Sequence, residues 1–414
     1  MLRWTLVCLG GLACRAELPP PSGTPYNLLV VLTDDIGRDR TGAYGSDLPT
    51  PNIDALAESG VRFTHAYSNP TCSPSRASLL TGRQPSRTQV GRWIAMHGGR
   101  QGLGRSETTI PELLRTSGHG YTSSAVGKWH LHSAKTRSVA KAPNTIGGFD
   151  HFAGILGNPR EAALTRRADD VADRGYFRWE KVVDGEASWS TTYLTTDTTD
   201  EAITSLQTLP EPWFLYVAYS AAHQPWHLPP ETLQQTGHPE DAPNPDRMDA
   251  MVEAVDTEIG RLLAALSPEV RERTVIVYAS DNGTEGTVAR PPLEPDRAKG
   301  TTYDGGVRVP FVVSGPVVAE PGTTNDALVH LVDVLPTFAD LVGVTPSAPL
   351  DGASLLPVLE DASVSRERVF TEGFYPNGPI RRSRDDAGEY VERMLRDREH
   401  KYVRWEGART TSRP

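Results

Sequence analysis

Cysteine is scarce in this sequence. Three cysteines occur in 414 residues, and two of them, Cys8 and Cys14, lie among the first twenty. If those residues are removed as an export leader, Cys72 is the one cysteine of the mature chain and cannot form an intramolecular disulfide. Cys72 is then either a reactive thiolate or a small buried apolar side chain, and the residues alone favour the second use.

An excess of positive charge is also missing. The formal net charge is -10, which argues against a general nucleic-acid-binding protein. An anionic substrate therefore has to be attracted by a local positive site and not by the field of the whole molecule.

Long apolar runs are absent as well. Arg3 precedes an apolar run from Trp4 to Ala13, and three prolines follow at 19–21. This pattern is typical of a secretory signal, and the run is too short for a stable membrane span. We expect residues 1–20 to be a signal peptide or a lipoprotein leader with Cys14 lipidated. The protein would then be exported, as a periplasmic, extracellular or lipoprotein-anchored protein; an untargeted apolar N-terminus is the alternative.

Apolar runs and helical patterns alternate along the rest of the chain. The apolar runs predict strands at Asn27–Leu32, Tyr121–Val126, Trp213–Tyr219, Thr274–Ala279 and Val309–Val313. The helical patterns lie at Asn52–Ser59, Ile110–Thr116, Thr198–Leu206, Met248–Leu266 and Leu331–Val342. This alternation predicts an α/β fold, with a large mixed, mostly parallel sheet flanked by helices.

The composition also suggests how the chain is divided. We expect an α/β catalytic domain over 26–364 and a small C-terminal α+β subdomain over 365–414. Residues 158–190 are polar and aromatic, and we expect an irregular insertion over the site. Arginines crowd the last fifty residues, where Glu392–Leu395 and Lys401–Trp405 predict a hairpin joined near Asp397. The basic cluster either approaches an anionic substrate or forms a solvated face.

Polar side chains directly follow two of the predicted strands. Asp34 and Asp35 follow the first strand, and Asp281 and Asn282 follow the strand at Thr274–Ala279. Each cluster alone is more typical of a turn. Because ligands bind beyond the carboxyl ends of strands in such sheets, two clusters at one edge favour a shared Ca²⁺ or Mg²⁺ site.

Cys72 begins a further motif, CSPSRASLLTG. Ser75 is a candidate N-cap for a helix over Arg76–Thr81, which would place Cys72 near a helix N-terminus. A helix N-terminus attracts anions, and the guanidinium of Arg76 adds a permanent positive charge and several hydrogen-bond donors.

The Cys72-x-Pro74-Ser75-Arg76 motif, followed by Leu79-Leu80-Thr81-Gly82, resembles the signature of type I sulfatases, in the alkaline-phosphatase-like superfamily. Further segments agree in order: TDD at 33–35, GKWH at 127–130, AAHQPWH at 221–227, SDNG at 280–283 and AKGTTYDGGVRVP at 298–310. The resemblance covers roughly 26–404. Relatives continue after Tyr402-Val403 with a strand and an acidic turn, so we expect a shortened C-terminal subdomain or an incomplete chain.

The resemblance implies that a maturation enzyme oxidises Cys72 to formylglycine (3-oxoalanine). It implies a cation, usually Ca²⁺ with Mg²⁺ as the alternative, held by Asp34, Asp35, Asp281, Asn282 and an oxygen of modified Cys72. Arg76 matches the residue that holds the formylglycine, and Lys128 and His130 match the pair beside it. Lys128, His223 and Lys299 match residues that contact the substrate, a sulfated small molecule or glycan.

The resemblance also implies a reaction. The hydrated aldehyde carries two hydroxyl groups, one of which attacks sulfur with Asp281 as base. His223 or Lys299 protonates the leaving alcohol, and His130 then removes the proton of the second hydroxyl so that sulfate is expelled. The cation and the basic side chains stabilise the charge that develops on the ester oxygens.

Two other functions stay open. A phosphonate or phosphate ester hydrolase of the same superfamily needs the same cation, nucleophile and positive cluster. An inactive sulfate- or glycan-binding relative is the third interpretation, and its signature would be a missing core residue. The sequence contains every core residue of the family, which disfavours this third interpretation.

Overall fold

A computed structural model describes residues 25–136, 138–162, 164, 174–361, 366–379 and 389–407. The predicted leader over 1–20 lies outside the described residues, as do Arg381, Arg382 and Arg384 of the basic cluster. Within the described part of the chain, no helix combines the length and the apolar composition needed to cross a membrane.

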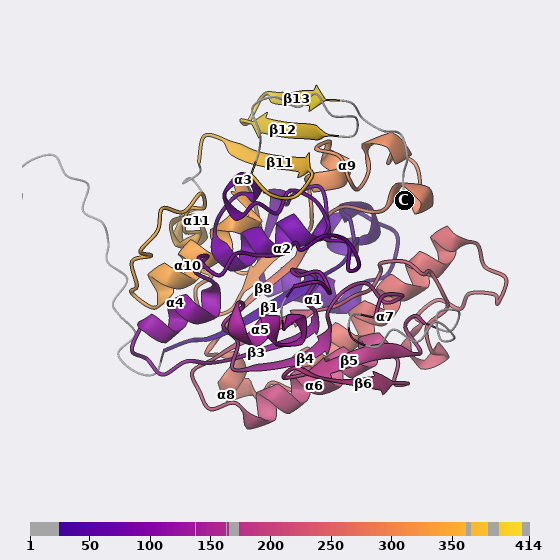
Figure 1. Ribbon diagram of the computed structural model, residues 1–414, viewed down its shortest axis with the longest axis horizontal. Helices are drawn as coiled ribbons and strands as arrows, with labels where there is room; N and C mark the ends of the chain where they lie inside the picture. The colour runs from indigo at the N-terminus through magenta and orange to yellow at the C-terminus, as the bar shows by residue number, and fades with distance from the viewer. Residues whose placement is uncertain are drawn as a thin grey trace, which may run out of the picture.

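One large mixed sheet forms the centre of the molecule (Figure 1). In the described part of the chain it has ten strands, in the order β10 (Thr323–His330), β2 (Gly60–Tyr67), β9 (Phe311–Ser314), β8 (Thr274–Ser280), β1 (Asn27–Thr33), β7 (Trp213–Ala218), β3 (Thr122–Lys128), β4 (His151–Ile155), β5 (Trp179–Val183) and β6 (Glu186–Ser190). The central strands from β8 to β4 are parallel, whereas β9 and β5 run antiparallel to their neighbours. The predicted mixed, mostly parallel sheet is confirmed.

Helices cover both faces of this sheet. Along β1, Leu28, Val30 and Leu32 belong to one apolar cluster, and Leu29 and Val31 belong to the other. The first cluster includes residues of α2 (Cys72–Thr81), α4 (Ile110–Thr116) and α10 (Val334–Leu341), and the second includes residues of α1 (Pro51–Glu58), α6 (Leu194–Thr208) and α7 (Asn244–Ala264). Burial on both faces explains why β1 is a continuous apolar run.

Shorter helices lie in the connections. The α-helical turns are α3 (Pro85–Thr88), α5 (Ala142–Thr145), α8 (Pro268–Arg271), α9 (Asp304–Val307) and α11 (Leu356–Glu360). The 3-10 turns are η1 (Arg38–Arg40), η2 (Gly42–Tyr44), η3 (Val139–Lys141), η5 (Glu231–Leu233), η6 (Gly286–Val288), η7 (Pro295–Arg297) and η8 (Leu331–Asp333).

The segment at 158–190 differs from the irregular insertion expected. Its second half forms the antiparallel hairpin β5–β6, which extends the sheet beyond β4. The hairpin was not predicted because β6 is a five-residue edge strand with no buried residue. Polar residues alternate with Ala187 and Trp189 in β6, but a pattern this short is a weak strand signal.

A second, three-stranded antiparallel sheet lies near the C-terminal end, at the top of Figure 1. It consists of β11 (Val369–Tyr375), β12 (Tyr390–Arg396) and β13 (Lys401–Gly407). The predicted hairpin is confirmed, and the amide of Asp397 closes its turn on the carbonyl of His400 at 3.0 Å. Lys401 attaches the hairpin to α9 through an ion pair of 2.6 Å with Asp304.

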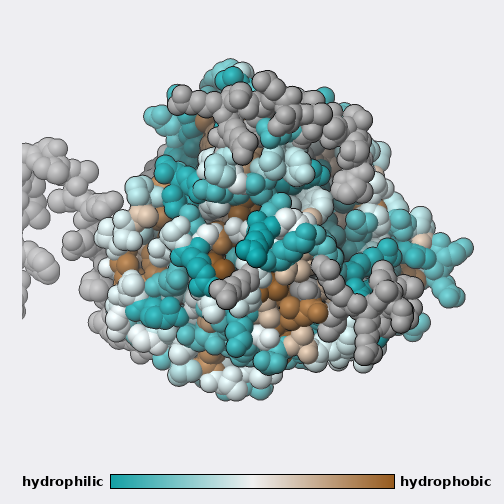
Figure 2. Space-filling model, in the orientation of Figure 1, coloured by the Kyte–Doolittle hydropathy of each residue, from teal (hydrophilic) through white to brown (hydrophobic). Residues whose placement is uncertain are grey.

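The described members of the basic cluster pair with carboxylates. Arg393 lies 3.2 Å from Glu372, and Arg404 lies 2.8 Å from Glu406. The charges of Arg393 and Arg404 are therefore balanced by their own neighbours. The face shown in Figure 2 is mostly hydrophilic, with apolar residues in small separate areas.

Candidate active site

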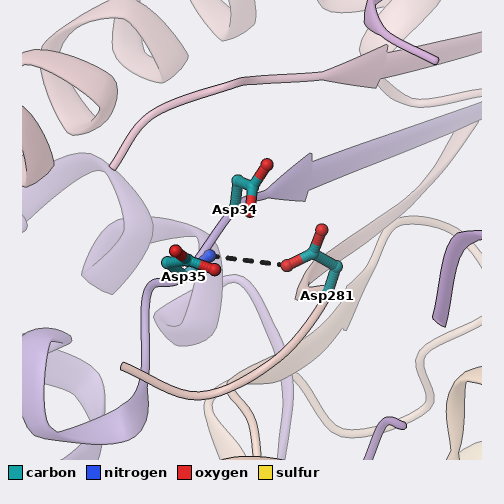
Figure 3. A group of neighbouring side chains, drawn as sticks. All are labelled: Asp34, Asp35 and Asp281. Carbon is teal, nitrogen blue, oxygen red and sulfur yellow. Dashed lines mark hydrogen bonds between the residues drawn. The ribbon is translucent and has the colours of Figure 1, made fainter. Parts of the chain in front are cut away.

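The register of β1 and β8 brings the two predicted acidic clusters together. The strands are parallel, with Thr33 opposite Ser280, so the residues that follow both strands meet at one edge. Ligand oxygens of Asp34, Asp35 and Asp281 all lie within 4.8 Å of one another. The amide of Asp35 also donates to Oδ1 of Asp281 at 3.4 Å (Figure 3). The expected juxtaposition at one sheet edge is thus observed.

These residues are suited to a hard cation. Asp34, Asp35, Asp281 and Asn282 are at most 1% exposed, yet Oδ1 of Asp34 and Oδ1 of Asn282 have no hydrogen-bond partner. A buried oxygen without a partner is costly. Burial, together with the charges of Asp34 and Asp281, raises the pKa of Asp35 to about 7 against the opposing effect of Lys299. A divalent cation would satisfy the free oxygens and remove this repulsion, and an oxygen-only set fits Ca²⁺.

Arg76 links the acidic cluster to helix α2. Its side chain is fully buried, and its Nε and Nη2 lie 2.9 and 2.8 Å from Oδ2 of Asp281. Nη2 also reaches Oδ2 of Asp34 at 3.3 Å, and Nη1 donates to the carbonyl of Lys128 at 2.8 Å. Burial disfavours the guanidinium charge, but Asp281 and Asp34 outweigh it and raise the pKa of Arg76. Arg76 is therefore a fixed cation beneath the site.

Two lysines complete the positive lining. Lys128, the last residue of β3, contacts Oδ2 of Asp34 and donates to Oδ1 of Asn158 at 2.9 Å. Lys299 lies 2.5 Å from Oδ1 of Asp35. Burial opposes ionisation of Asp34, yet Lys128 and the other cations lower its pKa well below the usual range. Arg76, Lys128 and Lys299 thus balance the three carboxylates of the cluster, and a bound divalent cation would make the site positive.

Cys72 begins helix α2, with Thr71 as the N-cap residue. The prediction that Ser75 caps a helix starting at Arg76 is wrong. The helix starts four residues earlier, and the hydroxyl of Ser75 instead bonds with the backbone of Asn69, at 3.0 and 3.1 Å. Cys72 is consequently in the first turn of α2, where the helix dipole favours negative charge, and it is 1% exposed.

His130 faces Cys72. Its Nδ1 lies 3.3 Å from Sγ of Cys72, and its Nε2 lies 3.0 Å from the carbonyl of Ile94. The carbonyl can only accept, so Nε2 carries the proton and Nδ1 presents a lone pair to residue 72. Burial and the charge of Lys128 lower the pKa of His130 to about 3. The imidazole is therefore neutral and oriented to take a proton from residue 72.

His223 lies in the turn that follows β7. Its Nδ1 is 2.8 Å from the carbonyl of Gln224, so Nδ1 carries the proton. Among the described residues, Nε2 has no protein hydrogen-bond partner and is left for a ligand. Burial and the charges of Lys128 and Lys299 hold the pKa of His223 well below its usual range.

Two residues of the site, Asn158 and Tyr176, were not predicted from the sequence. Asn158 holds Nζ of Lys128, and Tyr176 contacts the backbone of the His223 turn. Both residues belong to the segment at 158–190, which carries no motif, so no sequence signal marks them. All ten predicted site residues lie in the described part of the chain, and the contacts above link the acidic cluster to Arg76, Lys128 and Lys299, and Cys72 to His130.

Comparisons with known proteins identify the family of this chain. The family profile described as "Sulfatase" matches residues 26–344. Arylsulfatase A of Homo sapiens is 30% identical over 384 residues, covering 86% of this chain and 71% of that protein. Arylsulfatase J of Mus musculus is 28% identical over 365 residues, covering 85% of this chain, which spans only 59% of that relative's length.

Solved structures show the same fold. Ps i-CgsB, whose crystal structures include a complex with k-i-k-neocarrahexaose, superposes with a TM-score of 0.75 at 27% identity. The superposition covers 92% of this chain and 84% of the uncomplexed Ps i-CgsB chain. From the family match over 26–344 and from the fold, the chain belongs to the sulfatase family of sulfuric ester hydrolases.

Proposed function

We propose that this protein cleaves a sulfate ester of a glycan or an aryl alcohol, with Cys72 oxidised to formylglycine as its nucleophile. The observation that carries the proposal is the setting of Cys72. It is buried in the first turn of α2, 3.3 Å from the lone pair of a neutral histidine. A catalytic rather than a structural role explains why a proton acceptor is aimed at this side chain.

The cation belongs to the same proposal. Asp34, Asp35, Asp281 and Asn282 would hold it together with an oxygen of modified Cys72, and Ca²⁺ is favoured over Mg²⁺. When bound, the cation would offset the charge of the sulfate oxygens and make the attacking hydroxyl more acidic.

The remaining roles follow from the positions of the side chains. Lys128, His223 and Lys299 would bind sulfate oxygens, because the two lysines contact the acidic cluster and Nε2 of His223 has no protein partner among the described residues. Asp281 would accept the proton of the attacking hydroxyl. The negative charge of a bound sulfate ester would favour a protonated His223, and Nε2 of His223, or Lys299, would then give a proton to the leaving alcohol. His130 would take the second proton of residue 72, because its Nδ1 lone pair already faces that side chain.

Removal of the cation is a direct test of the site. We expect dialysis against a chelator to abolish turnover and to lower the melting temperature, because three buried carboxylates would then repel one another. Ca²⁺ should restore both quantities, as followed by differential scanning fluorimetry and by turnover of an aryl sulfate. Full activity in protein that is metal-free by elemental analysis would contradict the cation site.

The choice between ester types needs a substrate panel. We expect turnover of an aryl sulfate to exceed that of a matched phosphate diester and a matched phosphonate, measured as kcat/KM on one preparation. A strong preference for the phosphonate would favour the alternative function. Binding of a sulfated glycan with no turnover of any ester would favour the inactive relative.

The substrate class rests on the relatives. Two of them are named arylsulfatases, and Ps i-CgsB has been crystallised with a neocarrahexaose. Export, the maturation enzyme and a division at residues 364/365 into a catalytic domain and a small C-terminal subdomain also belong to this proposal. Mass spectrometry of the Cys72 peptide, purified from the native host, tests the modification independently of the substrate.

A further inference from the structure

One phenol outside the predicted set closes the turn that carries His223. The hydroxyl of Tyr176 lies 2.7 Å from the carbonyl oxygen of Ser220 and 2.7 Å from that of His223. Tyr176 is 1% exposed and precedes β5, so it comes from a different part of the chain than the turn. The one proton of this buried phenol is thus shared between the carbonyls at the two ends of a four-residue turn.

The other bonds of this turn show what the phenol adds. The amide of His223 donates to the carbonyl of Ser220 at 3.0 Å. The turn also bonds to the backbone of Asp34. The amide of Ala222 donates to the carbonyl of Asp34 at 2.7 Å, and the amide of Asp34 donates to the carbonyl of Ala221 at 3.1 Å. These bonds fix Ala221 and Ala222 against the acidic cluster. Among the described residues, the side chain that contacts the carbonyl of His223 is that of Tyr176.

The ring of Tyr176 is held in place by aromatic neighbours. Its centroid lies 4.5 Å from that of His227 and 6.0 Å from that of Tyr193. The hydroxyl of Tyr193 in turn lies 3.0 Å from Nε2 of His227. The phenol therefore cannot swing away from the turn without disturbing this packing, and its hydroxyl is aimed before any substrate arrives.

We infer that Tyr176 is a positioning residue for His223, one that fixes the direction of Nε2 toward the ester. The inference rests on the proposed function, in which His223 is protonated when the anionic ester binds, contacts the sulfate and protonates the leaving alcohol. Without the hydroxyl, the carbonyls of Ser220 and His223 lose their shared donor and the turn gains freedom. A misdirected imidazole then aids departure of the alcohol less well.

The test compares Tyr176→Phe with Tyr121→Phe. Tyr121 is also buried, and its hydroxyl also donates to a backbone carbonyl, that of Tyr26, at 2.6 Å. It precedes the amino end of β3, whereas Lys128 is at the carboxyl end of the same strand. Each variant therefore loses one phenol proton, which is shared by two carbonyls at Tyr176 and held by one carbonyl at Tyr121. Only the Tyr176 contacts lie at the site. Both should lower the melting temperature by a similar few degrees.

Activity is measured on a series of aryl sulfates whose leaving alcohols differ in acidity. General acid catalysis contributes roughly 10²–10⁴-fold, and it matters most when the leaving alcohol is weakly acidic. We expect Tyr176→Phe to lower kcat by about tenfold for the poorest leaving group and little for the best, with a smaller change in KM. Tyr121→Phe should leave the dependence of kcat on leaving-group acidity unchanged.

His223→Ala distinguishes the positioning role of Tyr176 from the proton-donor role of His223. It should steepen the dependence on leaving-group acidity further, and adding Tyr176→Phe to it should cause no additional change. If His223→Ala steepens the dependence of kcat on leaving-group acidity while Tyr176→Phe lowers kcat equally for every leaving group, the positioning role is overturned and the proposed function stands. No steepening in His223→Ala would overturn the proton-donor role of His223, and with it the inference.

Discussion

Cys72→Ser is expected to keep the fold and to lose about 10³-fold or more in turnover. Serine fits the same space in the first turn of α2, and its hydroxyl can donate to Nδ1 of His130. It offers one hydroxyl, however, whereas a hydrated formylglycine offers two. A serine that attacked the ester would keep the sulfate as a stable ester, because no second hydroxyl is available for its expulsion.

The measurement has two parts. Turnover of an aryl sulfate gives the loss, and mass spectrometry of the tryptic peptide around residue 72 shows whether sulfate has accumulated on the serine. Cys72→Ala is the matched control, because it removes the nucleophile and cannot retain sulfate. Wild-type-like activity in Cys72→Ser, or unmodified cysteine in active protein from the native host, would contradict the proposed mechanism.

Arg76→Met is expected to cost about 3–5 kcal/mol in the free energy of unfolding, and activity with it. Methionine keeps most of the side-chain length and removes the charge. Oδ2 of Asp281 then loses both of its contacts with the guanidinium, and Asp34 loses one. These carboxylates have no access to water, so the loss is that of an uncompensated buried charge.

A surface arginine provides the comparison. Arg87, in the neighbouring helix α3, pairs with Asp351 at 2.8 Å, and its side chain is 45% exposed. Arg87→Met should cost only about 0–1 kcal/mol, because water replaces the lost pair. Urea unfolding of both variants in the presence of Ca²⁺ gives the two values. If Arg76→Met were as stable as Arg87→Met, Arg76 would not be the cation that neutralises the acidic cluster.

Strands that are buried on both faces were predicted from the sequence more accurately than strands that are partly exposed. The strands β1, β7 and β8 are buried throughout and read as continuous apolar runs, so their positions were predicted within one residue. The strand β2 was missed, because Arg62, Thr64 and His65 are only partly buried and interrupt its pattern. Strand β10 was also not predicted, because it begins with four polar residues and its apolar run is short.

The site divides in a similar way. The acidic residues could be predicted to meet, because adjacent parallel strands end at one edge. The family resemblance supplied Lys128, His130, His223 and Lys299, whose spacing alone says little. The contacts of Arg76 with Asp281, of Asn158 with Lys128 and of Tyr176 with the His223 turn depend on how distant segments pack. No local pattern records such packing, and these contacts therefore required the structure.

The burial of Cys72 has a consequence for timing. Cys72 is 1% exposed, and the acidic cluster of the same site is complete only when β8 pairs with β1. During synthesis, Asp281 follows Cys72 by about 200 residues, which takes about 10–40 s at usual rates of translation. A maturation enzyme that must reach the thiol has this interval, together with any delay before β8 docks. Under the proposed modification, docking faster than this interval would trap unmodified cysteine, and slow completion of the sheet would favour the modified form.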